Sequence, residues 1–304
     1  MIVLRLLRFP NLVVVALTQW LVAQQILGKA YEQEGLVAVL NIEELLLIIF
    51  ATVCLTAAGY VINDLLDYPI DMINRPERVL VGQKIEEGTV RWLIASLIFI
   101  GFFSSILLAF LKQELAWLWL FPCFAVLLGI YPRALKTKPF AGNVFIAFCC
   151  AGTAGLIWLA ERSTWRLLSE PKMDQVSFII LLFMGYAFLA TWIREIIKDF
   201  EDLYGDIRLG RNTLPAYLGV TQAKRFVFAL SLVLIVTLCI GLIPWSYSLF
   251  QPQTATVSGC LIIGVVILLK KMRQASQSEH YFNLSQQWKF FLLGGLLLLF
   301  LYKI

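Results

Sequence analysis

Charged residues are scarce in this chain. Asp, Glu, Lys and Arg make up 15% of its 304 residues, whereas hydrophobic residues make up 60% and the mean hydropathy is +0.81. That composition lies far outside the range of soluble domains and is typical of integral membrane proteins. The sequence also lacks a hydrophilic segment long enough to form a soluble domain. We therefore expect a single transmembrane domain over residues 1–304.

Residues that commonly form metal sites or disulfides are also few. The single histidine, His280, follows Glu279 in a polar connector, and the six cysteines lie inside apolar runs without a C-x-x-C pair. This pattern argues against a zinc site and against structural disulfides. The sequence has no basic patch interleaved with exposed aromatic residues, so the formal net charge of +5 does not indicate a nucleic-acid partner.

Apolar runs long enough to cross a bilayer recur along the whole chain, separated by charged or Pro/Gly-containing connectors. Because these runs are continuous rather than alternating, they predict helices and argue against a β-barrel. The sequence therefore predicts an all-α integral membrane bundle of about nine transmembrane helices. They lie at roughly 11–28, 43–62, 91–111, 115–132, 142–160, 176–193, 226–243, 255–270 and 288–303.

The distribution of Lys and Arg predicts how the chain crosses the membrane. With the N-terminus inside, only six of the 25 basic residues fall on the outer side, namely Lys29, Lys112, Arg162, Arg166, Lys172 and Lys303. Cytoplasmic loops carry an excess of Lys and Arg. We therefore expect a multi-pass protein of the cell membrane with a cytoplasmic N-terminus and an outside C-terminus.

A cluster of carboxylates stands at the end of the second apolar run, in the stretch Asn63–Asp71. At helical periodicity, Asp64, Asp67 and Asp71 share one face. Pro69 is expected to bend or end this helix, which would place Asp71 on an adjoining turn. Because three crowded carboxylates repel one another near a membrane, we expect a cation to hold them, and Mg²⁺ is the natural candidate.

A second set of carboxylates, Asp199, Asp202 and Asp206, repeats the spacing of the first after another apolar helix on the same predicted side. Glu201 falls on a different helical face. Two such sets with basic residues beside them are suited to binding a diphosphate through Mg²⁺. Aromatic residues make up 13% of the chain, so the walls around that diphosphate are apolar, and the inferred substrate is a polyprenyl diphosphate. The basic residues expected to neutralise its phosphates are Arg75, Arg78, Lys136, Arg194 and Lys198.

Several of these positions match a known family pattern. The N-D-x-x-D-x-x-x-D signature of the UbiA superfamily of intramembrane prenyltransferases matches Asn63 through Asp71, and the second acidic motif of that family matches Asp199, Asp202 and Asp206. Tyr131 and Lys136 resemble its tyrosine-and-lysine element, and Asn11 resembles a polar position that lines its cavity. The chain thus resembles this superfamily over nearly its whole length. The resemblance implies a central cavity opening near the cytoplasmic face and Mg²⁺ as cofactor. It further implies a polyprenyl diphosphate donor, a lipophilic acceptor and contact with membrane lipid.

The resemblance also assigns roles to individual residues. The residues that would bind metal and act in catalysis are Asp64, Asp67, Asp71, Asp199, Asp202 and Asp206, and Tyr131 is a further candidate for catalysis. The residues that would bind substrate are Asn63, Arg75, Arg78, Lys136, Arg194, Lys198 and Asn11. For Tyr131 two interpretations stay open, a hydrogen-bond donor in the site or an interfacial anchor.

Within the superfamily, the runs Asn74–Arg78, Arg194–Asp206 and Thr213–Pro215 resemble most the digeranylgeranylglyceryl phosphate synthases, with Val79 where those enzymes usually have proline. This resemblance implies transfer of a geranylgeranyl group to the hydroxyl of a prenylated glycerol phosphate. An allylic carbocation, or a transition state like one, would be captured by the acceptor, with an aspartate or the released diphosphate taking the proton.

Other functions also use membrane-embedded carboxylates. Transfer to an aromatic acceptor of quinone or tetrapyrrole biosynthesis is the alternative within the superfamily. A cation transporter is an alternative of another class, but transporter carboxylates usually lie near the bilayer midplane, whereas these follow apolar helices. A CDP-alcohol phosphotransferase is disfavoured because its Gly- and Arg-containing aspartate signature is missing from the sequence.

Overall fold

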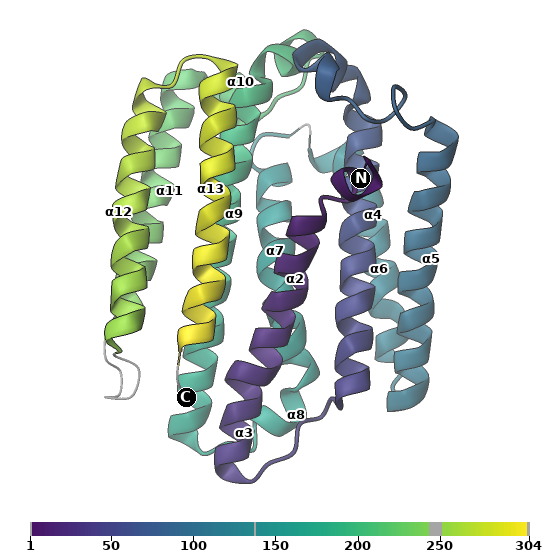
Figure 1. Ribbon diagram of the computed structural model, residues 1–304, viewed down its shortest axis with the longest axis vertical. Coiled ribbons are helices and arrows are strands. Elements are labelled where there is room, and N and C mark those ends of the chain that lie inside the picture. Colours follow the sequence, from purple (N-terminus) through teal and green to yellow (C-terminus); the bar gives the residue numbers. More distant parts are fainter. Residues whose placement is uncertain (1, 137, 243–250, 303–304) are drawn as a thin grey trace. The chain divides into compact units, whose positions relative to one another are not determined.

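The computed structural model describes residues 2–136, 138–242 and 251–302, and nearly all of these residues are helical (Figure 1). The sixteen helical elements are α1 (Ile2–Leu6), α2 (Phe9–Leu21), η1 (Val22–Gly28), α3 (Lys29–Glu34), α4 (Ile42–Asn74), η2 (Pro76–Arg78), α5 (Glu87–Lys112), α6 (Ala116–Ile130), η3 (Tyr131–Leu135), α7 (Ala141–Ala160), α8 (Arg162–Trp165), α9 (Glu170–Arg208), α10 (Leu214–Leu218), α11 (Val220–Ile240), α12 (Pro252–Gln274) and α13 (Ser278–Leu301). No β-strand is assigned within these ranges, so the all-α prediction is confirmed.

Eight helical stretches in the described part of the chain are long and apolar enough to cross a membrane. They are Phe9–Glu34, Ile42–Asn74, Glu87–Lys112, Ala141–Ala160, Glu170–Arg208, Val220–Ile240, Pro252–Gln274 and Ser278–Leu301. The remaining predicted span corresponds to α6, which has only 15 residues and leads directly into the π-helical turn η3. The chain is a multi-pass helical membrane protein, and the predicted count of about nine spans holds approximately.

The C-terminal part differs from the prediction in the extent of its helices. The predicted spans 255–270 and 288–303 leave a connector at 271–287, but α12 and α13 are 23 and 24 residues long and leave only a short connector at 275–277. The reason is that polar residues at helix ends extend a helix beyond its apolar run without lowering its stability. Lys303, assigned by the charge distribution to the outer side, lies outside the described residues.

Large apolar side chains cover the outside of many helices. Phe99, Phe110 and Phe290, for example, are 68%, 78% and 69% exposed. Such exposure is costly in water but favourable against lipid chains. The exposed side chains therefore fit the membrane assignment.

All six cysteines are free, which agrees with the expectation of no disulfides.

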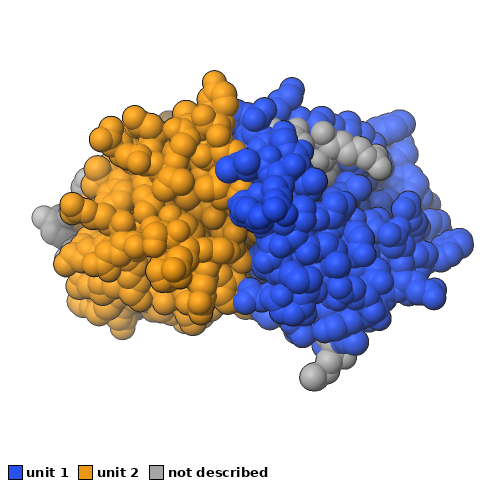
Figure 2. Space-filling model, turned by 90° about the horizontal axis from the view of Figure 1, so that it is seen from above, with its two compact units in different colours: residues 1–16, 41–142, 204–213 blue, residues 17–40, 143–203, 214–304 orange. Residues whose placement is uncertain are grey.

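Contacts divide the chain into two compact units, each assembled from three separate stretches (Figure 2). Unit 1 comprises residues 1–16, 41–142 and 204–213, and unit 2 comprises residues 17–40, 143–203 and 214–304. In unit 1, α4 packs along α5 and α6 (Figure 1). In unit 2, α12 packs between α11 and α13, and Trp288 of α13 donates a hydrogen bond to the carbonyl of Ala190 (2.8 Å). The expectation of a single domain stays a prediction.

Helix α4 begins at a capping box. The Asn41 side chain accepts a hydrogen bond from the Glu44 backbone N–H, and the Glu44 carboxylate accepts one from the Asn41 N–H, each at 2.9 Å. These bonds satisfy two backbone donors that a helix start would otherwise leave unpaired. Glu44 also pairs with Lys112 at the end of α5 (2.7 Å). The start of α4 is thereby fixed against its neighbour.

The expectation that Pro69 would place Asp71 outside the helix was wrong. Helix α4 continues through Pro69 to Asn74, so all three aspartates of the first motif lie on one helix. A proline removes one backbone donor, which a long and well-packed helix can tolerate. Hydrogen bonding resumes directly afterwards, since the Arg75 N–H donates to the Asp71 carbonyl (2.8 Å).

The two helices that carry acidic motifs are the longest of the described chain. Helix α4 has 33 residues and α9 has 39. At 1.5 Å per residue they extend about 50 and about 60 Å, whereas the apolar core of a bilayer is about 30 Å thick. Each helix therefore extends beyond the apolar core, and each motif lies in the last third of its helix.

Candidate active site

Each aspartate of the first motif is paired with a basic side chain of unit 1. Arg8 lies 2.5 Å from Asp64, and Arg75 lies 3.4 Å from Asp71 one helical turn away. The third aspartate, Asp67, is paired with two cations. Basic residues of the chain thus supply the positive charge that the sequence analysis assigned to a metal ion.

Asp67 has the most complete set of partners. Lys136 donates to one carboxylate oxygen of Asp67, and Arg211 donates to the other at 2.9 Å. Lys136 also donates to the side-chain oxygen of Asn63 (2.9 Å). Asp67 is buried, and such a carboxylate stays charged only when cations and hydrogen bonds compensate for its lost hydration. The structure therefore brings together Asn63, Asp67 and Lys136, three of the candidate residues of the sequence analysis.

Arg8 reaches Asp64 from a break between two helices. Its φ angle is +51°, in the left-handed region, and it lies between α1 and α2. Its guanidinium also stacks over the ring of Tyr60, 4.9 Å from the ring centre. Left-handed backbone is unfavourable for a non-glycine residue and occurs often at functional sites. Asn11 follows closely, with its N–H donating to the Arg8 carbonyl (2.8 Å).

Lys136 is positioned by the wide turn η3 that ends the α6 segment. Its N–H donates to the carbonyl of Tyr131, five residues earlier, at 2.9 Å. π-Helical turns of this kind are rare and frequent at functional sites. Tyr131 is buried at the start of the turn. The tyrosine and the lysine therefore belong to one local structure.

The segment 206–213, which follows Gly205, places Arg211 in contact with Asp67. Gly210 has a φ angle of +66°, which lets the chain turn after α9, and the Arg211 N–H donates to the Asp206 carbonyl (2.9 Å). The Asp206 carboxylate accepts a hydrogen bond from the Thr213 hydroxyl (2.9 Å). Asp206 is therefore buried at the base of a closed turn, and this turn presents Arg211.

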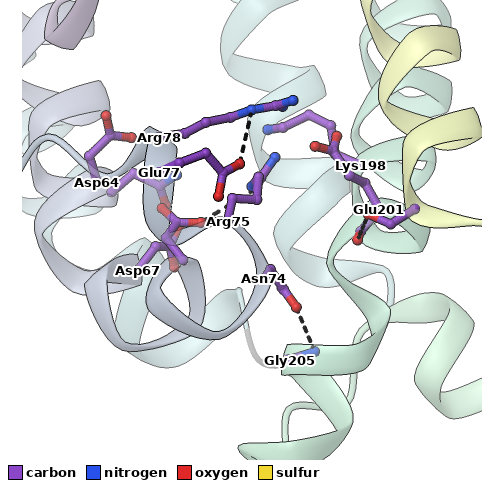
Figure 3. A network of polar contacts seen from close by, with 12 residues as sticks. Asp64, Asp67, Asn74, Arg75, Glu77, Arg78, Lys198, Glu201 and Gly205 are labelled. Atoms are coloured by element: carbon purple, nitrogen blue, oxygen red, sulfur yellow. Dashed lines mark hydrogen bonds and ion pairs between the residues drawn. The ribbon is translucent and has the colours of Figure 1, made fainter.

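A side-chain contact fixes this turn to the first motif. The Asn74 side-chain oxygen accepts a hydrogen bond from the Gly205 N–H at 3.0 Å (Figure 3). A Cβ at position 205 would lie 2.6–2.9 Å from the Asn74 amide atoms, so only glycine allows this approach. The ends of α4 and of the 204–213 segment are therefore in direct contact within unit 1.

Arg78 is the most exposed of the basic residues predicted in unit 1. It lies in η2, and its Nε atom is 3.6 Å from the Glu77 carboxylate (Figure 3). Its side chain is 47% exposed, against 23% for Arg75. An exposed ion pair of this length contributes little to stability. Arg78 therefore presents its positive charge where an anion can reach it.

The second motif has different partners in unit 2. Asn143, at the start of α7, donates a hydrogen bond to the Asp199 carboxylate at 2.7 Å. The predicted substrate-binding residues Arg194 and Lys198 both contact Glu195, at 2.9 and 2.8 Å. The Nε atom of Arg194 is buried without an acceptor in the described part of the chain. Such an unsatisfied donor is costly, which favours a ligand as its partner.

The predicted metal ligands are divided between the two units. Asp64, Asp67, Asp71 and Asp206 belong to unit 1, whereas Asp199 and Asp202 belong to unit 2. Within the described ranges no group of three or more Asp, Glu, His or Cys residues is arranged to hold a metal ion. The carboxylate oxygens are the ligand type that Mg²⁺ prefers, so the residues fit this ion chemically. Three of these six carboxylates, those of Asp64, Asp67 and Asp71, are paired with basic side chains.

Sequence reasoning missed four residues of these networks, namely Arg8, Asn143, Glu195 and Arg211. Arg211 lies 144 positions from its partner Asp67, and Asn143 lies 56 positions from Asp199. Arg8 and Asn143 stand at helix starts, and Arg211 follows the second motif within a few residues. Polar residues at such places were a signal that could have identified them.

Known proteins resemble the chain in sequence. The family model described as the UbiA prenyltransferase family matches residues 26–302. A digeranylgeranylglyceryl phosphate synthase of Methanothrix thermoacetophila is 35% identical over 196 residues, 64% of this chain and 65% of that protein. The synthase of the same name from Thermococcus gammatolerans is 33% identical over 184 residues, covering 59% of each. The chain thus matches less than two thirds of the length of these relatives.

Solved structures resemble it in fold. A structure of digeranylgeranylglyceryl phosphate synthase has a TM-score of 0.63 and 23% identity, covering 99% of this chain and 97% of that one. A UbiA homologue from Archaeoglobus fulgidus, solved with GPP and Mg²⁺, has a TM-score of 0.56 and 16% identity, covering 98% and 99%. At these identities the likeness shows a shared fold.

Proposed function

Because the chain belongs to the UbiA prenyltransferase family, we propose that it transfers a prenyl group from a polyprenyl diphosphate to a lipophilic acceptor in a Mg²⁺-dependent reaction. The observation that carries this proposal is the first acidic motif, where carboxylates and basic side chains of unit 1 gather at the end of a membrane-spanning helix. This combination suits a ligand with a charged diphosphate head and a hydrocarbon tail.

In this reaction the basic residues bind the phosphate oxygens of the donor. Lys136, Arg75 and Arg78 have the charge and partial exposure that this role requires. Mg²⁺, when bound, would supply positive charge to the departing diphosphate. The residues that would hold it are Asp64, Asp67, Asp71, Asp199, Asp202 and Asp206. Asn63 orients Lys136, and exclusion of water from the site would protect the allylic cation.

For the acceptor we propose prenylglyceryl phosphate and for the transferred group geranylgeranyl, since both named relatives are digeranylgeranylglyceryl phosphate synthases. The product would be an ether lipid precursor. Arg194, whose buried Nε atom has no acceptor among the described residues, is a candidate for binding the acceptor phosphate. Transfer to an aromatic acceptor of quinone or tetrapyrrole biosynthesis is the second candidate, because it uses the same donor chemistry.

An acceptor panel tests the proposal. Purified protein in detergent is incubated with geranylgeranyl diphosphate, Mg²⁺ and either prenylglyceryl phosphate, hydroxybenzoate or dihydroxynaphthoate, and products are identified by mass spectrometry. We expect product only with prenylglyceryl phosphate, and none when EDTA replaces Mg²⁺. Product with an aromatic acceptor alone would favour the second candidate. Cation flux in liposomes without any product would support the transporter alternative.

We also propose that the N-terminus and the acidic motifs are cytoplasmic and the C-terminus is outside. Two single cysteines, introduced into a variant without native cysteines, test this orientation. One replaces Glu77, which follows α4 and is 69% exposed, and the other replaces Val37, which precedes α4 and is 83% exposed. An impermeant maleimide added to intact cells should label only the cysteine at position 37. Labelling at position 77 alone would show that the chain has the opposite orientation in the membrane.

A further inference from the structure

Each carboxylate of the first motif contacts at least one basic side chain. Asp64, Asp67 and Asp71 together contact four basic residues, namely Arg8, Lys136, Arg211 and Arg75. An acidic motif that binds divalent cations would be expected to carry excess negative charge. These cations compensate the charge of the three carboxylates, so a metal ion must compete with them for the carboxylate oxygens.

We propose that Arg211, together with Lys136, holds Asp67 closed to metal ions until the donor diphosphate arrives. This inference rests on the proposed function and adds a positioning residue and an order of binding to it. The two cations contact different oxygens of the same carboxylate. Both oxygens are therefore engaged, and a metal ion that ligates either one must approach a bound cation.

The burial of this cluster strengthens the effect. The side chains of Asp67 and Arg211 are 11% and 17% exposed, and that of Lys136 is 22% exposed. Charges that are poorly exposed to water interact more strongly than surface charges, because the effective dielectric constant is lower. Replacing either cation with a neutral residue should therefore change the affinity of Asp67 for a metal ion measurably.

Arg211 is held in place by a built turn rather than by its ion pair alone. The Gly210 backbone conformation, the hydrogen bond from the Arg211 N–H to Asp206 and the bond from Thr213 to the Asp206 carboxylate close this turn. The bond between Gly205 and Asn74 then fixes the turn to α4. The guanidinium is consequently presented to Asp67 in a defined position.

The negative charge of the donor diphosphate competes with Asp67 for Lys136 and Arg211. A diphosphate group carries several negative charges, and Lys and Arg side chains form strong, charge-assisted hydrogen bonds with phosphate oxygens. When Lys136 and Arg211 bind the diphosphate, the Asp67 oxygens become available to Mg²⁺, which prefers to bridge carboxylates and phosphates. Binding of donor and metal is then mutually dependent, and such coupling is reciprocal.

Two binding measurements, neither of which needs turnover, test this inference. The affinity for Mn²⁺ alone is measured by electron paramagnetic resonance in detergent, and the affinity for geranylgeranyl thiodiphosphate alone is measured in EDTA. We expect Arg211→Gln to bind Mn²⁺ about tenfold more tightly, equivalent to about 1.4 kcal/mol, and to bind the metal-free donor analogue about tenfold more weakly than wild type. Lys136→Gln should change both affinities in the same directions.

Arg208→Gln is the matched control, because Arg208 lies three positions away, is exposed and stacks over the Tyr204 ring. It should change neither affinity. Arg211→Lys keeps the charge and should keep Mn²⁺ binding weak. Mn²⁺ affinity that is unchanged or lower in both Arg211→Gln and Lys136→Gln, or raised equally in Arg208→Gln, would overturn the inference. If Arg211→Gln bound Mn²⁺ more tightly and the donor analogue more weakly, but the wild-type protein transferred no prenyl group, only the proposed function would be overturned.

Discussion

The two acidic motifs have the same spacing but different partners. In the first, Asp64, Asp67 and Asp71 each contact a lysine or an arginine. In the second, Asp199 accepts a hydrogen bond from the neutral amide of Asn143. The basic residues beside the second motif, Arg194 and Lys198, contact Glu195, which lies outside the motif.

This difference shows that spacing identifies carboxylates but does not determine how they are held. The charge of a carboxylate paired with a cation is compensated, and a metal ion must compete with that cation for the carboxylate. A hydrogen bond from a neutral amide orients a carboxylate without adding a positive charge beside it. The two motifs are therefore expected to respond differently when their partners are changed.

The largest effect is expected from removing a carboxylate. Asp64→Ala and Asp202→Ala should each lower prenyl transfer by at least about 1000-fold, because each removes charge that stabilises bound metal and the leaving diphosphate. Turnover of geranylgeranyl diphosphate by purified protein, with equal thermal stability as a condition, measures this. Asp174→Ala, at an exposed position near the start of α9, is the control and should keep full activity. Full activity in only one of the two motif variants would mean that a single motif suffices.

A smaller effect is expected from the amide partner of the second motif. Asn143→Leu removes the hydrogen bond to Asp199 and should lower kcat/KM about tenfold, the equivalent of one strong hydrogen bond to a charged group. Asn143→Gln retains the amide and should recover part of the loss. If Asn143→Leu were as inactive as Asp202→Ala, the amide would do more than orient its carboxylate.

The smallest expected effect concerns stability. Gly205→Ala places a Cβ against the Asn74 amide and should lower the free energy of unfolding by about 1–3 kcal/mol. Gly185→Ala is the matched control in the same helix, since a Cβ there meets nothing within 4 Å. Thermal unfolding in detergent compares the two variants. Equal melting temperatures would show that the contact between Gly205 and Asn74 is not tight.

The helices were predictable because long apolar runs in a membrane have few alternatives to helix. The predictions were wrong where a local sequence preference was outweighed by the packing or length of the whole helix. Pro69 is tolerated because α4 is long, and α12 and α13 extend into polar sequence that a hydropathy pattern assigns to a loop. Hydropathy therefore located the spans better than it located their ends.

The site was predictable in its carboxylates and less so in its partners. The motif spacing identifies Asp67, and the resemblance to a known family pointed to Lys136. The contact of Arg211 with Asp67 depends on the turn after α9 reaching α4, which is a property of tertiary packing. For the same reason the sequence could not show that Glu195 contacts both Arg194 and Lys198.

One measurement tests the central claim most directly, namely that the first motif is a diphosphate site whose carboxylates exchange basic partners for metal. It is a crystal structure with Mn²⁺ and geranylgeranyl thiodiphosphate, in which anomalous diffraction locates the metal. We predict Mn²⁺ bound to Asp67, with Lys136 and Arg211 on the diphosphate oxygens. Mn²⁺ bound elsewhere, with both cations still on Asp67, would contradict the account.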